Sequence, residues 1–306
     1  MRVSLSVTDY SFPDGDGKST LAVQLARIAH AADAAGLDTV WVSDHLIQAA
    51  PGSAPDAEML EAYTTLAFLS AQTKRVRIGA MVTNASLRPA ALLIKTVTTL
   101  DVLSEGRAWL GIGAGYHEAE AEAMGFDLPP VVERFERLEE TLQLASHMWS
   151  GDTSPFRAKH LRLARPVDNP QPLTKPHPPI LIGGMGEKKT LRLVARYADA
   201  CNLFDIPDEG RTIIHKLSVL ARHCETIGRP YDEIEKTLST RLETGESAEH
   251  FTERCARLTT LGIEHVVVIT AGPWRDEAVE TLAAAVPAVR QIDRDFGDSG
   301  ATAKPH

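Results

Sequence analysis

Two adjacent residues have side chains suited to acid–base chemistry on a bound organic molecule. Asp44 and His45 follow the apolar run Thr39–Ser43. A histidine near neutral pH can take or give a proton, and an aspartate can accept a hydrogen bond from a ring N–H. The alternative interpretation is a loop aspartate that caps a turn, next to a solvated histidine. We expect Asp44 and His45 to be catalytic, and Asp44 to contact the bound ligand as well.

Two glycine-rich segments are the second candidate feature. Gly111–Gly115 (GIGAG) lacks the G-x-G-x-x-G spacing of a dinucleotide-binding turn, but its glycines would let a flat ligand approach the backbone. Gly183–Gly186 (GGMG) precedes Glu187–Lys189, and free N–H groups at a glycine-rich helix start can bind phosphate. Either segment can also be a plain strand-to-helix turn. No metal site is expected, because the 11 histidines show no H-E-x-x-H or paired metal spacing.

These candidates follow strands in one alternating pattern of strands and helices. The expected strands are Arg2–Val7, Thr39–Ser43, Val76–Val82, Trp109–Ile112, Ile180–Ile182, Ala200–Phe204, Glu235–Leu242 and His265–Thr270. Alternating strands and helices indicate a parallel sheet, and eight such units in 306 residues indicate an α/β protein with a closed (β/α)₈ TIM barrel. The alternative is an open, doubly wound sheet. Active sites of such barrels lie at the carboxyl ends of the strands, where both candidate features fall.

The barrel pattern defines the expected domain organisation. Residues 151–178 interrupt the pattern with six of the 18 prolines, so we expect an inserted excursion before the fifth strand, with a β-hairpin at Phe156–Leu163. Residues 1–293 would form a single domain and 294–306 a polar tail. Helices are expected near Glu58–Gln72 and at Glu187–Tyr197, and Pro287 should bend or end the last one. The side chains expected to fill the barrel interior are Val40, Val42, Ile78, Leu110, Ile182, Leu203, Val267 and Ile269.

Composition excludes several other classes of function. The formal net charge of −9 argues against nucleic-acid binding, which needs a basic face. No apolar run reaches the ~18–20 residues of a membrane span, and the start of the chain does not resemble a signal peptide. Three widely spaced cysteines give no disulfide framework. We therefore expect a cytoplasmic protein with a small-molecule substrate and neither a nucleic-acid nor a membrane partner. The glutamates at 118, 120 and 122 are interpreted as a solvated face.

Several runs of residues resemble those of the luciferase-like monooxygenase superfamily. They are Val42–His45, the run from Arg88-Pro89 through Leu100–Arg107 into Leu110–Tyr116, Glu118-x-Glu120 ending at Met124-Gly125, Arg134–Glu140 and Pro178–Gly184. The most specific part is the stretch from L-S-x-G-R to G-A-G, and the resemblance extends from residue 1 to about residue 290. It implies a TIM barrel with an excursion before the fifth strand. It also implies a non-proline cis peptide near Met81-Val82, behind the cofactor.

Members of this superfamily use flavin mononucleotide (FMN) or the deazaflavin coenzyme F420, and this chain looks more like the F420-dependent branch. The resemblance implies an oxidoreductase that moves a hydride between F420 and a small organic substrate, with Asp44 touching the deazaflavin and His45 as acid or base. The alternatives are an FMN-dependent monooxygenase that uses O₂, and a non-catalytic ligand-binding relative. The expected cofactor-binding residues are Asp44, Met81, Val82, Thr83, Asn84, Gly113, Ala114, Gly115, Tyr116, Gly183, Gly184, Met185 and Gly186.

The chain departs from the sugar-phosphate dehydrogenases of that branch at two places. Tyr116 stands where they carry a glutamate after the glycine turn, and Leu46–Ala49 lacks their tryptophan. Oxidation of glucose-6-phosphate is therefore not expected, and His117 or Glu118 could replace the missing acid, if one is needed. A homodimer is also expected, because relatives usually dimerise through helices beside the barrel. Leu66, Phe68, Leu69, Leu92 and Leu93 suggest more apolar surface there than one helix stripe needs.

Overall fold

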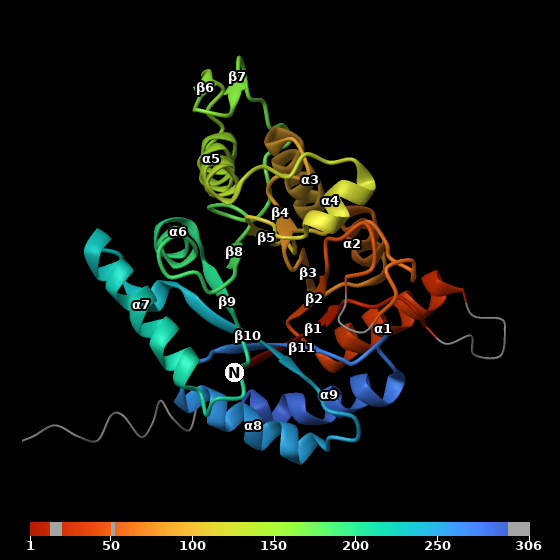
Figure 1. The fold of residues 1–306 in the computed structure, drawn as a ribbon. Helices are drawn as coiled ribbons and strands as arrows, with labels where there is room; N and C mark the ends of the chain where they lie inside the picture. Colours follow the sequence, from red (N-terminus) through yellow and green to blue (C-terminus); the bar gives the residue numbers. More distant parts are fainter. Residues whose placement is uncertain (13–19, 50–52, 293–306) are drawn as a thin grey trace, which may run out of the picture.

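The computed structural model describes residues 1–12, 20–49 and 53–292, which form a barrel of parallel strands surrounded by helices (Figure 1). The strands of the main sheet are β1 (Arg2–Val7), β2 (Thr39–Val42), β3 (Arg77–Ala80), β4 (Thr83–Asn84), β5 (Leu110–Gly113), β8 (Ile180–Gly183), β9 (Ala200–Phe204), β10 (Glu235–Arg241) and β11 (His265–Ile269). Their order is β3-β2-β1-β11-β10-β9-β8-β5-β4, and every pairing is parallel.

The sheet closes between β3 and β5. The Ile78 N–H donates to the Arg107 carbonyl at 2.9 Å, and the Trp109 N–H donates to the Ile78 carbonyl at 2.9 Å. The predicted strand at Val76–Val82 is interrupted after Ala80 by the cis peptide Met81-Val82, and β4 continues it against β5. The nine strands therefore occupy eight positions around the barrel, which confirms the predicted TIM barrel and the cis peptide that the resemblance implied.

Helices pack around the outside of the barrel. They are α1 (Leu21–Ala35), α2 (Ala62–Gln72), α3 (Ala90–Leu103), α4 (Glu118–Met124), α5 (Val131–Trp149), α6 (Thr190–Tyr197), α7 (Arg211–Ile227), α8 (Ala248–Thr260) and α9 (Asp276–Val289), with a short 3₁₀ turn at Tyr231–Glu233. Helices α2 and α6 begin later than predicted. The α2 helix begins after Glu61, whose side chain caps it by accepting from the Thr64 N–H at 2.7 Å. Residues 187–189 form a turn before α6. Pro287 does not end the last helix, as one of the two predicted outcomes required, because α9 continues past it to Val289.

The barrel interior is filled by different side chains from those predicted. Trp41, Trp109, Leu181, Ala200 and Val267 form the inner cluster, and the rings of Trp41 and Trp109 lie 5.6 Å apart. Of the predicted set only Val267 belongs to this cluster. The others except Ile269 are buried in the larger cluster between strands and helices, namely Val40, Val42, Ile78, Leu110, Ile182 and Leu203. Ile269 is half-buried at the end of β11. Successive residues of a strand point to opposite faces of the sheet. For most strands the prediction therefore named the residue next to the one that points into the barrel.

The excursion and the predicted dimer surface can now be placed. The predicted hairpin exists as β6 (Phe156–Arg157) and β7 (Arg162–Leu163), an antiparallel pair that projects beyond the end of α5 (Figure 1). The apolar residues expected at a dimer surface do not form one. Leu66, Leu69 and Leu93 are fully buried in this chain's own core, and among the five only Leu92 is exposed, at 56%. None of the described helices is long and apolar enough to span a membrane.

A partly buried ion cluster at the amino end of the barrel gives a pH-dependent contribution to stability. Burial raises the pKa of Asp38, but the nearby charges of His265, Arg77 and Arg2 and a hydrogen bond from Thr39 outweigh burial and hold this pKa below its ordinary value. The Thr39 hydroxyl donates to Asp38 at 2.7 Å. A lowered pKa in the folded state stabilises the fold above the ordinary value of about 3.9, and this stabilisation is lost as pH falls through the folded-state value.

We therefore expect Asp38→Asn to lower the free energy of unfolding at pH 7 by about 1.5–3 kcal/mol, the usual contribution of a hydrogen bond to a charged group. The difference from the wild type should begin to shrink as the pH falls below about 4, where Asp38 becomes protonated in the unfolded chain, and should vanish below the lower pKa of the folded state. Urea unfolding of both proteins at several pH values measures this. An equal difference at pH 7 and at pH 3 would contradict the assignment.

Candidate active site

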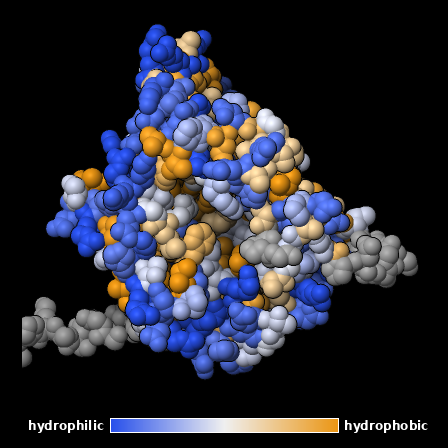
Figure 2. Space-filling model, viewed as in Figure 1, coloured by the Kyte–Doolittle hydropathy of each residue, from blue (hydrophilic) through white to orange (hydrophobic). Residues whose placement is uncertain are grey.

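The predicted site residues lie together at the carboxyl ends of four neighbouring strands. Asp44 and His45 follow β2, residues 81–84 join β3 to β4, residues 113–116 end β5, and residues 183–186 end β8. Figure 1 views the barrel from this end, with α4 in front of β5. Figure 2, in the same view, shows a hollow near the centre of this face, bordered by both hydrophobic and polar residues. The barrel thus gathers residues that are up to 142 positions apart, from Asp44 to Gly186.

His45 is held between a carboxylate and a phenol. Its Nδ1 lies 3.0 Å from Glu120 Oε2, and its Nε2 lies 3.4 Å from the Tyr116 hydroxyl. The His45 ring packs edge-on against Tyr116 and His117, with centroids 5.9 and 5.6 Å away. The His45 side chain is 18% exposed and that of Glu120 only 4%. One nitrogen of His45 therefore faces a buried acceptor, and the other faces the 70%-exposed Tyr116.

The interpretation of the glutamate run as a solvated face was wrong for Glu120. Glu118 and Glu122 are exposed, but Glu120 is buried. It lies in the first turn of α4, where the His117 side chain accepts from the Glu120 N–H at 3.0 Å. Its carboxylate accepts from the Leu46 N–H at 2.5 Å. The long sequence separation between Glu120 and His45 hides this contact, and no local pattern around α4 points to it.

Asp44 is bound by a residue whose role the sequence did not reveal. The Arg88 guanidinium donates to both Asp44 oxygens, at 2.6 and 2.9 Å, and to Glu61 at 2.5 Å. It also lies over the Tyr63 ring, 4.9 Å from the centroid. Burial lowers the pKa of Arg88, but the hydrogen bonds and charges of Asp44 and Glu61 raise it further than burial lowers it. The Asp44 side chain is completely buried, so its carboxylate is engaged by Arg88 in this structure.

The segments after β3 and β5 form a tightly packed wall at the mouth. Val82 lies between Gly113 and Gly183, and a Cβ on either glycine would come within 3.0 Å of the Val82 side chain. Gly115 has φ +76°, and a Cβ there would come within 2.2 Å of the Asn84 carboxamide. These glycines are therefore needed for the close approach of the protein's own chain. The Thr83 hydroxyl is hydrogen-bonded to the Tyr63 hydroxyl at 2.8 Å and is buried.

The mouth has the features that a flat heterocyclic cofactor needs. Met81, Val82, Ala114 and Met185 are apolar and only partly buried there. Two polar atoms beside Asp44 are buried without a hydrogen-bond partner among the described residues, namely Ser43 Oγ and Tyr10 Oη. Burial and the charges of Asp44 and Glu61 raise the pKa of Tyr10, so this phenol keeps its proton. An apolar wall with a few unpaired polar groups fits a flavin or deazaflavin ring.

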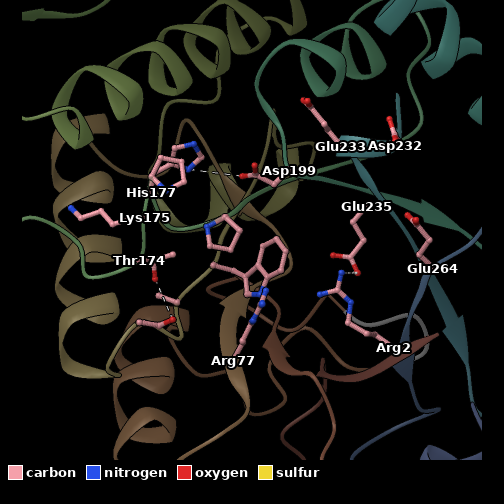
Figure 3. A pocket seen from close by; sticks show the side chains of 15 residues that line it. Arg2, Arg77, Thr174, Lys175, His177, Asp199, Asp232, Glu233, Glu235 and Glu264 are labelled. Carbon is pink, nitrogen blue, oxygen red and sulfur yellow. Dashed lines mark hydrogen bonds and ion pairs between the residues drawn. The ribbon is translucent and has the colours of Figure 1, made fainter. Parts of the chain in front are cut away.

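Three further observations concern phosphate binding, metal binding and the opposite end of the barrel. The predicted phosphate-binding segment 183–186 lies at the mouth, but α6 begins only at Thr190, so its first turn is offset from the glycines. No cluster of metal-binding side chains occurs among the described residues. A cavity of about 620 Å³ lies at the opposite, amino end of the barrel (Figure 3). Its lining includes Arg2 and Glu235, paired at 2.7 Å, but none of the predicted site residues.

Comparison with known proteins places this chain in a family. Residues 1–298 match the luciferase-like monooxygenase family. An F420-dependent glucose-6-phosphate dehydrogenase of Kineococcus radiotolerans is 32% identical over 73% of this chain and 64% of its own length. A similar dehydrogenase of Amycolatopsis mediterranei is 33% identical over 57% of this chain and 50% of its own. The chain thus spans about half to two thirds of the length of these curated relatives.

Solved structures share the fold at low sequence identity. An F420-dependent secondary alcohol dehydrogenase, in complex with an F420–acetone adduct, has a TM-score of 0.80 at 17% identity, covering 94% of this chain and 99% of its own. The F420-dependent tetrahydromethanopterin reductase of Methanopyrus kandleri has a TM-score of 0.75 at 13% identity, covering 94% and 98%. Because the family model matches residues 1–298, nearly the whole length of the chain, the chain belongs to the luciferase-like monooxygenase family.

Proposed function

We propose that this protein is an F420-dependent oxidoreductase that transfers a hydride between the deazaflavin and a small organic substrate. The observation that carries the proposal is the barrel mouth, where His45, held by Glu120, follows β2 and the half-buried apolar residues Met81 and Val82 follow the neighbouring strand β3. The relatives at 32–33% identity that are named F420-dependent dehydrogenases support the choice of cofactor. Enzymes with a ring cofactor leave the redox chemistry to the ring, and the protein supplies orientation and proton transfer.

The residues divide this work as follows. Met81, Val82, Ala114 and Met185 would hold the ring, which supplies hydride transfer when bound. His45 Nε2 would take the proton from a substrate alcohol during oxidation, or give a proton to the substrate during reduction. Proton and hydride then move to or from the same substrate, so the charges balance. Asp44 would act through its ion pair with Arg88, which fixes the loop that carries His45.

The residues beside His45 narrow the class of substrate that we propose. Tyr116, not a carboxylate, lies next to His45 Nε2, and residues 46–49 contribute no tryptophan to the mouth. A site without that acid and that indole differs from the sugar-phosphate dehydrogenases that it resembles. We therefore propose an uncharged or weakly polar alcohol, enone or nitro compound as substrate, rather than glucose-6-phosphate.

The choice between F420 and FMN is tested by titrating each cofactor into the purified protein and following the fluorescence of its four tryptophans. We expect micromolar binding of F420 and much weaker binding of FMN. Turnover is then followed at the deazaflavin absorbance band with a panel of enones, alcohols and nitro compounds. Micromolar FMN binding without F420 binding would reverse the proposal in favour of an O₂-using monooxygenase. Binding of F420 without turnover of any panel compound would favour a ligand-binding relative.

A further inference from the structure

The Glu120 carboxylate is surrounded by N–H donors. Oε1 accepts from the Leu46 N–H at 2.5 Å and lies 3.5 Å from the Ile47 nitrogen, while Oε2 faces His45 Nδ1 at 3.0 Å. The side chain is 4% exposed, so bulk water does not supply further partners. An ionised carboxylate can only accept hydrogen bonds. In this arrangement the His45 nitrogen that faces Glu120 must therefore carry a hydrogen.

The other ring nitrogen of His45 is left for chemistry. A neutral imidazole carries one N–H, so a hydrogen on Nδ1 leaves Nε2 with a free lone pair. Nε2 lies 3.4 Å from the exposed Tyr116 hydroxyl. The titratable side chains facing His45 in the described structure are Glu120, Tyr116 and His117, since the Asp44 carboxylate is turned to Arg88. None of the others offers an acceptor to Nδ1.

We propose that Glu120 is a positioning residue that fixes the Nδ1–H tautomer of His45, so that Nε2 is the single atom through which His45 exchanges a proton. The β5–α4 segment supplies this carboxylate to a loop 74 residues earlier in the chain. The proposal deepens the proposed function, on which its catalytic part rests, but the tautomer itself is a property of the protein without cofactor. The tautomer of a catalytic histidine is commonly set by the hydrogen bond of its other nitrogen.

A merely structural role for Glu120 is the competing explanation, because its carboxylate also holds the Leu46 N–H. Glu120→Gln separates the two roles. The glutamine carbonyl oxygen can still accept from Leu46, whereas its NH₂ group can only donate to Nδ1. This substitution should therefore keep the loop in place and shift the His45 hydrogen to Nε2. Glu122→Gln is a matched control, because Glu122 lies exposed on the same helix.

The tautomer is measured by two-bond ¹H–¹⁵N correlation spectra of ¹⁵N-histidine-labelled protein without cofactor. His45→Gln identifies the His45 signals among the 11 histidines. We expect the Nδ1–H tautomer in the wild type and in Glu122→Gln, and the Nε2–H tautomer in Glu120→Gln. Thermal unfolding of each variant shows that the fold is kept. An Nε2–H tautomer in the wild type, or the same tautomer in the wild type and Glu120→Gln, would overturn the proposal.

Turnover by the F420-loaded protein provides the second measurement. We expect Glu120→Gln to lower kcat by about 10²-fold or more, as a wrong tautomer does beside a catalytic histidine, with little change in KM. If Glu120→Gln shifts the tautomer of His45 but leaves kcat unchanged, the proposed effect of the tautomer on catalysis is wrong. If F420 does not bind at all, the proposed function fails while the spectra still decide whether Glu120 sets the tautomer. The two failures are therefore distinguishable.

Discussion

His45→Ala should lower turnover with F420 by about 10²–10⁴-fold, the usual contribution of a general acid or base. Its effect on F420 binding should be much smaller, because a single hydrogen bond contributes only about 0.5–1.5 kcal/mol. The structure supports this separation, since the His45 ring is fixed by Glu120 on one side and faces Tyr116 on the other. The apolar wall that would carry most of the ring contact is formed by other residues, including Met81 and Val82.

Steady-state kinetics at saturating F420, together with a fluorescence titration of the cofactor, measure the two effects for His45→Ala. Tyr116→Phe is the matched variant, because it removes only the hydroxyl next to Nε2. A smaller loss is expected for Tyr116→Phe than for His45→Ala. If His45→Ala turns over at the wild-type rate while Tyr116→Phe does not, the proton is exchanged by Tyr116, and His45 only shapes the mouth.

Arg88→Met should destabilise the protein by about 3–5 kcal/mol, the cost of breaking a buried ion pair by removing one partner. Arg88 bridges the fully buried Asp44 and the partly exposed Glu61. Without Arg88 the Asp44 carboxylate would be left buried without a cation. It would then be protonated or draw in water, and both responses cost stability.

Urea unfolding of Arg88→Met measures this loss. Arg27→Met is the control, since Arg27 pairs with Asp276 at 3.2 Å but both side chains are at least half exposed. Exposed pairs usually contribute about 0–1 kcal/mol. The double variant Asp44→Asn/Arg88→Met should recover part of the lost stability, because it removes the unpaired charge. A loss below about 1 kcal/mol in Arg88→Met would mean that Asp44 does not depend on Arg88.

The barrel could be predicted from the sequence because its signal is repeated along the whole chain. Each strand–helix unit independently indicates a parallel sheet, so an error in one element leaves the architecture unchanged. The inward face was harder to assign. The strand Thr39–Val42 is buried on both sides, and its pattern therefore does not show that Trp41, rather than Val40, points inward. Leu66 and Leu69 were similarly mistaken for surface, because a core residue and an interface residue have the same side chains.

From the sequence we could predict candidate site residues that are adjacent in the chain, but not the partners that the fold brings to them. Asp44 and His45 are adjacent, and their position after a strand was enough to place them at the mouth. Their partners Glu120 and Arg88 lie 76 and 44 residues from Asp44, on other elements. Such a pairing depends on how α4 and the loop before α3 fold over the mouth. No local spacing contains that information, so an acidic run and an arginine appeared ordinary until the fold was known.

The tryptophans inside the barrel couple its two ends, which matters for protein engineering. Trp109 lines the cavity at the amino end and packs in one cluster with Trp41, and Met81 and Val82 at the mouth pack against that cluster. Free-energy changes at sites that share a packing partner usually do not add. Substitutions that fill the amino-end cavity should therefore be selected together with libraries that vary the mouth.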